Sequence, residues 1–89
     1  MRRYLFTSEF FAAFPRSACV ELATEDSLEA RSRQMGRRMA FIEERIPTAE
    51  FCSLFTRNGP NRESASVRVQ FHFADKGHAA FFLLGASDL

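Results

Sequence analysis

Residues 27–46, SLEARSRQMGRRMAFIEERI, decide how this chain folds. A helix advances about 100° per residue, so one narrow arc of this segment carries an apolar stripe that we expect to face the core. The stripe consists of Leu28, Ser32, Met35, Met39, Ile42 and Ile46. Asp26 and Glu29 stand at the spacing of a capping box, and Pro47 ends the pattern. The segment therefore predicts a long amphipathic helix.

Alternating apolar and polar residues on both sides of this helix predict β-strands. Residues 18–23 alternate before the helix, and residues 49–56 and 65–73 follow it. In the last of these strands, the residues that we expect to face the core are Ala65, Val67, Val69, Phe71 and Phe73. The Asn, Gly and Pro residues in 57–62 predict the turn that joins the two later strands.

The N-terminal end of the chain adds two short elements. Residues 2–7 are consistent with a short strand or an extended arm. Thr7 or Ser8 can then cap a short helix over residues 9–14, which Pro15 ends. This short helix exposes several Phe side chains that need a surface to pack against.

The C-terminal segment leaves two alternatives open. Asp75 can cap a helix that runs to Gly85, and the pair Ala79-Ala80 favours this interpretation. Alternatively, residues 75–77 form a hairpin turn and residues 78–84 form a further strand.

The order of these elements predicts a single α+β domain over residues 1–89. We expect an antiparallel sheet with the long central helix and a C-terminal helix packed on one face, which is a split β-α-β arrangement. A ferredoxin-like variant of this fold needs one more strand, and residues 2–7 are the segment that can supply it.

Composition fits one compact domain and narrows the function. The chain is 46% hydrophobic and contains 11 Phe, which suits a packed core in 89 residues. A net charge of +1 argues against a protein that its overall charge steers onto nucleic acid. The basic residues are almost all Arg, whose planar guanidinium groups suit interfaces.

The two cysteines and the two histidines give no pattern of a zinc site. Cys19 and Cys52 lie far apart in the sequence, and His72 and His78 do not follow a finger spacing. A disulfide requires the strands that carry the two thiols to be neighbours, so we expect free thiols and no cofactor. The chain also lacks the pattern of a signal peptide and any apolar run near the roughly 20 residues of a membrane span. We therefore expect a cytoplasmic location and no contact with a membrane.

The strongest candidate contact surface lies on the long helix, opposite the expected core stripe. There Phe41 is expected to point outward as an apolar anchor, surrounded by polar and basic side chains. We predict that this surface binds a partner through Phe41 together with Arg31, Gln34, Arg37, Arg38 and Arg45. The alternative is that the aromatic segment Phe10, Phe11 and Phe14 covers Phe41 and that the arginines form an ordinary solvated face.

The polar side of the sheet is a second candidate surface. Arg68, Gln70 and His72 share it, and Cys19 and Glu21 can lie beside them. Such a face can bind RNA, a peptide or a second copy of the chain. A thiol of Cys19 or Cys52 with His72 and Glu21 would supply the residue types for nucleophilic catalysis, but nothing in their spacing requires proximity. No Gly-rich elbow accompanies them, so we expect a protein that is not an enzyme.

The C-terminal pattern Val69-Gln70-Phe71-His72-Phe73-Ala74-Asp75, followed by His78-Ala79-Ala80-Phe81 and Leu83, resembles short phage-encoded accessory proteins, among them anti-CRISPR inhibitors. The resemblance implies a non-enzymatic protein of a phage or mobile element that occludes a bacterial defence complex such as CRISPR-Cas. It implies as partner a host protein or a ribonucleoprotein complex, and it assigns no functional residue. A homodimer is compatible with the Phe-rich surface. The alternative function is a small module that binds RNA or DNA.

Overall fold

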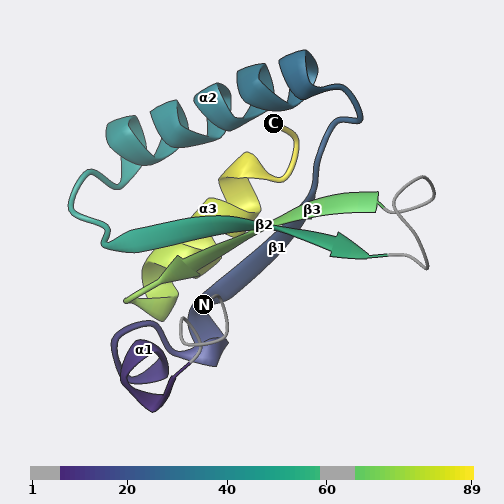
Figure 1. Cartoon of the computed structure of the whole chain (residues 1–89). Helices are drawn as coiled ribbons and strands as arrows, with labels where there is room; N and C mark the ends of the chain where they lie inside the picture. The colour runs from purple at the N-terminus through teal and green to yellow at the C-terminus, as the bar shows by residue number, and fades with distance from the viewer. Residues whose placement is uncertain (1–6, 59–65) are drawn as a thin grey trace.

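The computed structural model describes residues 7–58 and 66–89 of the chain. The elements in these ranges, shown in Figure 1, are α1 (Ser8–Ala13), the 3-10 helix η2 (Arg16–Ala18), β1 (Cys19–Ala23), α2 (Leu28–Arg45), β2 (Phe51–Asn58), β3 (Ser66–Phe73) and α3 (Lys76–Ala86). The strand or arm expected at residues 2–7 lies outside the described residues except for Thr7, which caps α1. Most of the turn expected in 57–62 lies outside them as well.

The three strands form one sheet in the order β1-β3-β2. Both β1 and β2 pair with β3 in antiparallel fashion, so β1 and β2 run in the same direction on either side of it. The connection from β1 to β2 passes through α2 (Figure 1). This confirms the α+β class. The described residues contain no fourth strand, so the ferredoxin-like variant stays a prediction.

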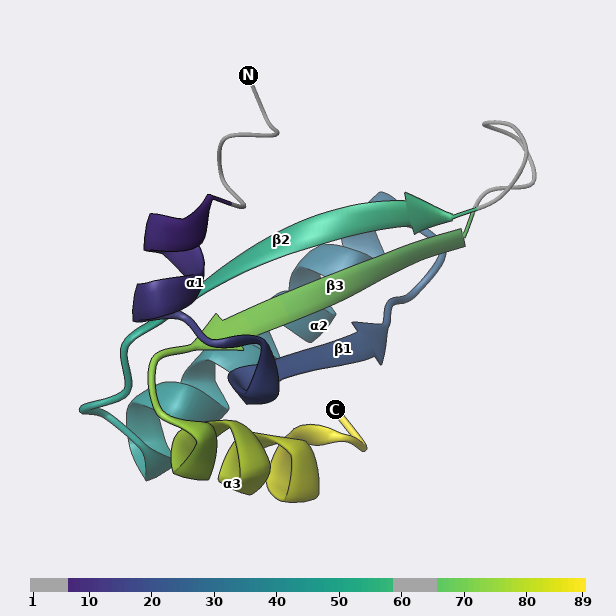
Figure 2. The same ribbon diagram turned by 90° about the horizontal axis from the view of Figure 1, so that it is seen from below.

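Two helices cover one face of the sheet, and the short α1 lies on the other (Figures 1 and 2). The core lies between the sheet, α2 and α3, where Phe71 and Phe73 of β3 meet Phe82 of α3 and Ile42 of α2. The ring centroids of Phe71 and Phe82 are 4.6 Å apart, and both rings are fully buried. Each such ring stabilises the fold by about 1.5–3 kcal/mol through burial alone.

Side-chain caps explain where the two longer helices begin. The hydroxyl of Ser27 accepts a hydrogen bond from the amide of Ala30 at 3.1 Å, so the cap is Ser27 and not Asp26. At α3, the carboxylate of Asp75 accepts from the amide of Gly77 at 2.6 Å. The helical alternative for the C-terminal segment is therefore confirmed, and the hairpin alternative is wrong.

Strand β2 is longer than its sequence pattern indicates. It continues through Asn58, whereas the Asn, Gly and Pro content predicts a turn from residue 57. The register explains the extension, because Arg57 pairs with Val67 and Asn58 pairs with Ser66 of β3. Pairing with a neighbouring strand outweighs the local turn preference at these positions.

Candidate contact surface and the His72 pocket

The buried side of α2 differs from the predicted stripe. Ile42 is buried as predicted, but Leu28 is 74% exposed and Met39 is 36% exposed. Gln34 and Arg38 are buried instead. The predicted stripe is correct at Met35, Ile42 and Ile46, which pack at the core, and wrong at Leu28, Ser32 and Met39, which are exposed. Apolar spacing does not register a long polar side chain that finds partners inside the fold.

Arg38 and Gln34 hold the end of the chain against the fold. A terminal nitrogen of Arg38, a residue only 2% exposed, donates to the carbonyls of Ala23 at 3.0 Å and Leu89 at 3.1 Å. The amide nitrogen of Gln34 donates to the same Leu89 carbonyl at 3.0 Å, and its oxygen accepts from the amide of Glu25 at 3.0 Å. These contacts correct the expectation that both side chains face an external partner.

Arg31 also makes contacts within the chain. Its guanidinium donates to the carbonyls of Glu25 at 3.2 Å and Asp26 at 2.9 Å, and so stabilises the turn that leads into α2.

Burial lowers the pKa of Arg38 from its ordinary value, and the neighbouring charge of Arg37 lowers it further. Both effects arise because Arg38 leaves water while Arg37 stays exposed on the same helix.

Phe41 lies between α2 and α3 and not in the outward position predicted for it. The ring is half-buried, 5.8 Å from the ring of Phe81 and 6.0 Å from that of Phe82 between centroids. Gly85 makes this approach possible, since a Cβ at that position would lie 2.7 Å from Cε2 of Phe41. The alternative cover by the N-terminal aromatic segment is wrong too, because Phe10 packs on the opposite face of the sheet, against His72.

The outer edge of this contact remains open to solvent. Phe81 is 43% exposed and Leu84 is 83% exposed on the same side of α3. The guanidinium of Arg45 lies 5.9 Å from the Phe41 ring centroid, and the exposed Arg37 lies one turn before Phe41. We call this surface the α2–α3 seam: Phe41, Phe81 and Leu84, with Arg37 and Arg45 at its border.

Helix α3 is apolar around nearly its whole circumference. Ala79, Phe82 and Ala86 face the core, while Phe81, Leu83 and Leu84 are exposed. A helix of this kind is normally covered on more than one side. The contact surface predicted from the sequence did not include α3. Its signal is nevertheless present in the segment KGHAAFFLLGA, in which only the first residues are polar.

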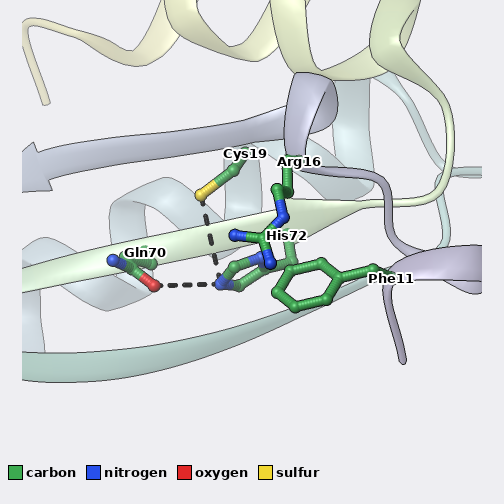
Figure 3. A pocket seen from close by; sticks show the side chains of 5 residues that line it. All are labelled: Phe11, Arg16, Cys19, Gln70 and His72. Carbon is green, nitrogen blue, oxygen red and sulfur yellow. Dashed lines mark hydrogen bonds between the residues drawn. The ribbon is translucent and has the colours of Figure 1, made fainter. Parts of the chain in front are cut away.

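A second candidate site, the His72 pocket, lies on the opposite face of the sheet. Its cavity of about 400 Å³ is lined by Phe11, Arg16, Cys19, Gln70 and His72 (Figure 3). The guanidinium of Arg16 lies 3.9 Å from the Phe11 ring centroid at the mouth. Nε2 of His72 lies 3.0 Å from Oε1 of Gln70 and 4.0 Å from the Cys19 sulfur.

The register of the sheet brings together Cys19, Cys52 and His72, whose positions in the sequence did not show whether they lie close to one another. Cys19 of β1 and Cys52 of β2 both pair with His72, so the three residues form one row across the sheet. Glu21 is not part of this group, because its carboxylate accepts from Nε of Arg68 at 3.0 Å. His72 is only 3% exposed, so α1 closes part of the face that the sequence left as an open platform.

The protonation states in this pocket are opposite to those of an activated cysteine. The pKa of the Cys19 thiol is raised, mainly by burial and further by Glu21 and Cys52, so the thiol stays protonated at neutral pH. Burial lowers the pKa of His72, so the imidazole stays neutral. A catalytic thiolate needs a lowered pKa next to a cationic partner. The row therefore offers weak hydrogen-bonding groups and not a nucleophile.

The two thiols are free and are separated by a strand. Because β3 lies between β1 and β2, Cys19 and Cys52 are two strand spacings apart, about 9.6 Å, which is beyond the reach of a disulfide. In the described ranges, no three His, Cys, Asp or Glu residues are grouped so that they could hold a metal ion. No helix in those ranges combines the length and apolarity needed to cross a membrane.

Comparison with known proteins gives no relative from which a role can be transferred. No protein family, curated protein or solved structure matches this chain.

Proposed function

We propose that this chain is a non-catalytic binding protein that docks its α2–α3 seam on another protein. The supporting observation is the exposure of Phe81, whose ring lies beside that of the half-buried Phe41, and of Leu84 one turn later, on a helix that has almost no polar side. Contiguous apolar side chains with a polar border are typical of protein interfaces.

The chemistry of the seam defines what kind of surface it fits. Phe81 and Leu84 provide an apolar anchor, and Arg37 and Arg45 provide guanidinium donors at its border. The complementary surface is an apolar recess with carboxylates at its rim, since guanidinium groups pair with carboxylates in two-pronged hydrogen bonds.

The class of partner follows from the resemblance in residues 69–83. We carry over from it a host protein or ribonucleoprotein complex of bacterial defence, such as CRISPR-Cas, as the target. The mechanism is occlusion: a rigid surface covers a site that the complex needs, without any chemical step. The protonated thiol and the neutral imidazole of the His72 pocket support a role without catalysis.

Two substitutions on exposed leucines test the seam. Leu84→Glu adds a charge at a side chain that is already 83% exposed, so the fold should tolerate it. Leu28→Glu is the matched control, because Leu28 is 74% exposed but lies at the start of α2, outside the seam.

The measurement is capture of partner proteins from bacterial lysate, followed by affinity measurement with the purified partner. Leu84→Glu should weaken binding by about tenfold or more, as loss of a central apolar contact does. Leu28→Glu should leave it unchanged. Equal binding by both variants would contradict the proposal. An affinity that falls steeply with added salt would instead favour nucleic acid as the ligand.

A further inference from the structure

We propose that the His72 pocket binds a small carboxylate with a flat apolar body, and that the guanidinium of Arg16 holds the charged end of this ligand. The pocket lies on the face of the sheet that α1 partly covers, whereas α2 and α3 cover the other face (Figure 2). A bound ligand therefore leaves the α2–α3 seam free, and this inference does not rest on the proposed docking of the seam.

The cavity has the size and the lining of a small-molecule site. Its volume of about 400 Å³ lies near the lower end of the roughly 300–1,000 Å³ that is typical of ligand pockets. Phe11 supplies an apolar wall, and the other four lining residues carry polar groups. A few polar groups beside an apolar wall are the usual means by which a pocket fixes the orientation of a small ligand.

The charge of the pocket selects an anion. Among the described residues that line the cavity, Arg16 is the only charged one, and its guanidinium forms no ion pair with any of the described residues. The Cys19 thiol stays protonated because burial raises its pKa. Glu21, two residues along the same strand, is paired with Arg68 at 3.0 Å. The positive charge of Arg16 is therefore available to a ligand, and guanidinium groups pair well with carboxylates.

Gln70 and His72 give the pocket a second, neutral donor. Oε1 of Gln70 can only accept, so Nε2 of the neutral imidazole donates to it at 3.0 Å. The carboxamide nitrogen of Gln70 then remains as a donor that has no acceptor in the described part of the chain. Figure 3 shows the side chains of Arg16, Cys19 and Gln70 gathered around the imidazole. Two donor groups without acceptors fit a ligand that carries acceptor oxygens, as a carboxylate does.

The backbone holds Arg16 in place before any ligand binds. Arg16 begins η2, in which the amide of Ala18 donates to the carbonyl of Pro15 at 2.9 Å. Ala18 is fully buried, which fixes η2 against the sheet. On the other side, the guanidinium lies over the Phe11 ring of α1, 3.9 Å from its centroid. A donor that is already ordered loses less freedom on binding, and this favours affinity for a small ligand.

Titration with benzoate, followed by proton–nitrogen correlation NMR of the full chain, tests the site. We expect saturable shifts of the Gln70 side-chain amide and of the Arg16 Nε–H, with a Kd of about 0.1–1 mM for a ligand of this size. Benzamide has the same ring without the charge, and acetate has the charge without the ring. Each of them should bind at least about tenfold more weakly than benzoate.

Substitutions of two exposed arginines show whether the guanidinium of Arg16 carries the binding. Arg16→Gln removes the charge and should raise the benzoate Kd about tenfold or more. Arg16→Lys keeps the charge and should bind benzoate more tightly than Arg16→Gln. Arg37→Gln is the matched control, because it removes the same charge from an exposed position on α2, and it should leave the Kd unchanged. The spectrum of each variant also shows that the fold is retained.

Four results would overturn the inference. Absence of saturable shifts would exclude the site. Equal affinities for benzoate and benzamide would show that charge does not select the ligand. Equal affinities for benzoate and acetate would show that the apolar wall takes no part. Shifts confined to residues outside the pocket, or an equal loss of affinity in Arg16→Gln and Arg37→Gln, would place the bound anion elsewhere. None of these results bears on the seam, which the Leu84→Glu variant tests separately.

Discussion

The contact between Gly85 and Phe41 yields a quantitative prediction for a single methyl group. Neither Gly36 nor Gly85 has a left-handed backbone, so alanine fits the backbone at both positions. The two sites differ only in the space around the new Cβ. At Gly36 no atom lies within 4 Å, whereas at Gly85 the Cβ would lie 2.7 Å from Cε2 of Phe41 and closer still to Cζ.

The expected effects have opposite signs. Gly36→Ala should raise the free energy of unfolding by about 1 kcal/mol, because alanine is the better helix former. Gly85→Ala gains at most the same amount but forces the Phe41 ring out of its place against Phe81 and Phe82, and such overpacking costs about 1–3 kcal/mol. The net effect at Gly85 should be a loss of about 1 kcal/mol.

Urea unfolding followed by circular dichroism measures both effects. For a domain of this size, 1 kcal/mol corresponds to a change in Tm of about 4–8 °C. Adding Phe41→Leu to Gly85→Ala should recover part of the loss, since the shorter side chain frees the space for the Cβ. If Gly85→Ala stabilises the protein as much as Gly36→Ala does, the packing of Phe41 against α3 is wrong.

Three further predictions concern the polar interior. Arg38→Met should lower the free energy of unfolding by about 1.5–3 kcal/mol in urea, because the hydrogen bonds from its charged guanidinium to the carbonyls of Ala23 and Leu89 are lost. Arg37→Met on the exposed side should change it by less than about 0.5 kcal/mol. After mild oxidation, mass spectrometry should find no intramolecular disulfide between Cys19 and Cys52, because β3 separates their strands. Alkylation of the folded protein should become fast only above pH 9.0, because burial raises the pKa of both thiols. Burial lowers the pKa of His72 below 6.5, so in mild acid the unfolded chain binds more protons than the folded chain. The stability that the neutral imidazole contributes is therefore complete above pH 6.5 and is lost as the pH falls below it. His72→Gln should therefore flatten the dependence of unfolding free energy on pH below 6.5, and an unchanged slope would contradict the burial of this imidazole.

Local pattern located most of the elements, because their signals lie within a few residues of one another. It ended β2 too early, however, and left the C-terminal segment open between helix and strand. The cap at Asp75, the stop at Pro47 and the alternation ending at Phe73 each act through neighbours in the chain, and the structure has helices and a strand at these places. The order of the elements then restricts the architecture to an α+β sheet with a helical crossover, because a strand, a helix and a strand must pack their apolar sides together.

The candidate surfaces depended on contacts between segments that are distant in the chain. The apolar spacing of α2 predicts that Phe41 points outward. In the structure, the side of α2 that carries Phe41 lies against α3, because Gly85 leaves space for the Phe41 ring and the carbonyl of Leu89 accepts hydrogen bonds from side chains of α2. The register of the sheet, which no single strand specifies, places Cys19 beside His72. Periodicity alone treats every polar residue as facing solvent, whereas the folded chain buries Arg38, one terminal nitrogen of which bonds to carbonyls of two segments that are distant in the sequence.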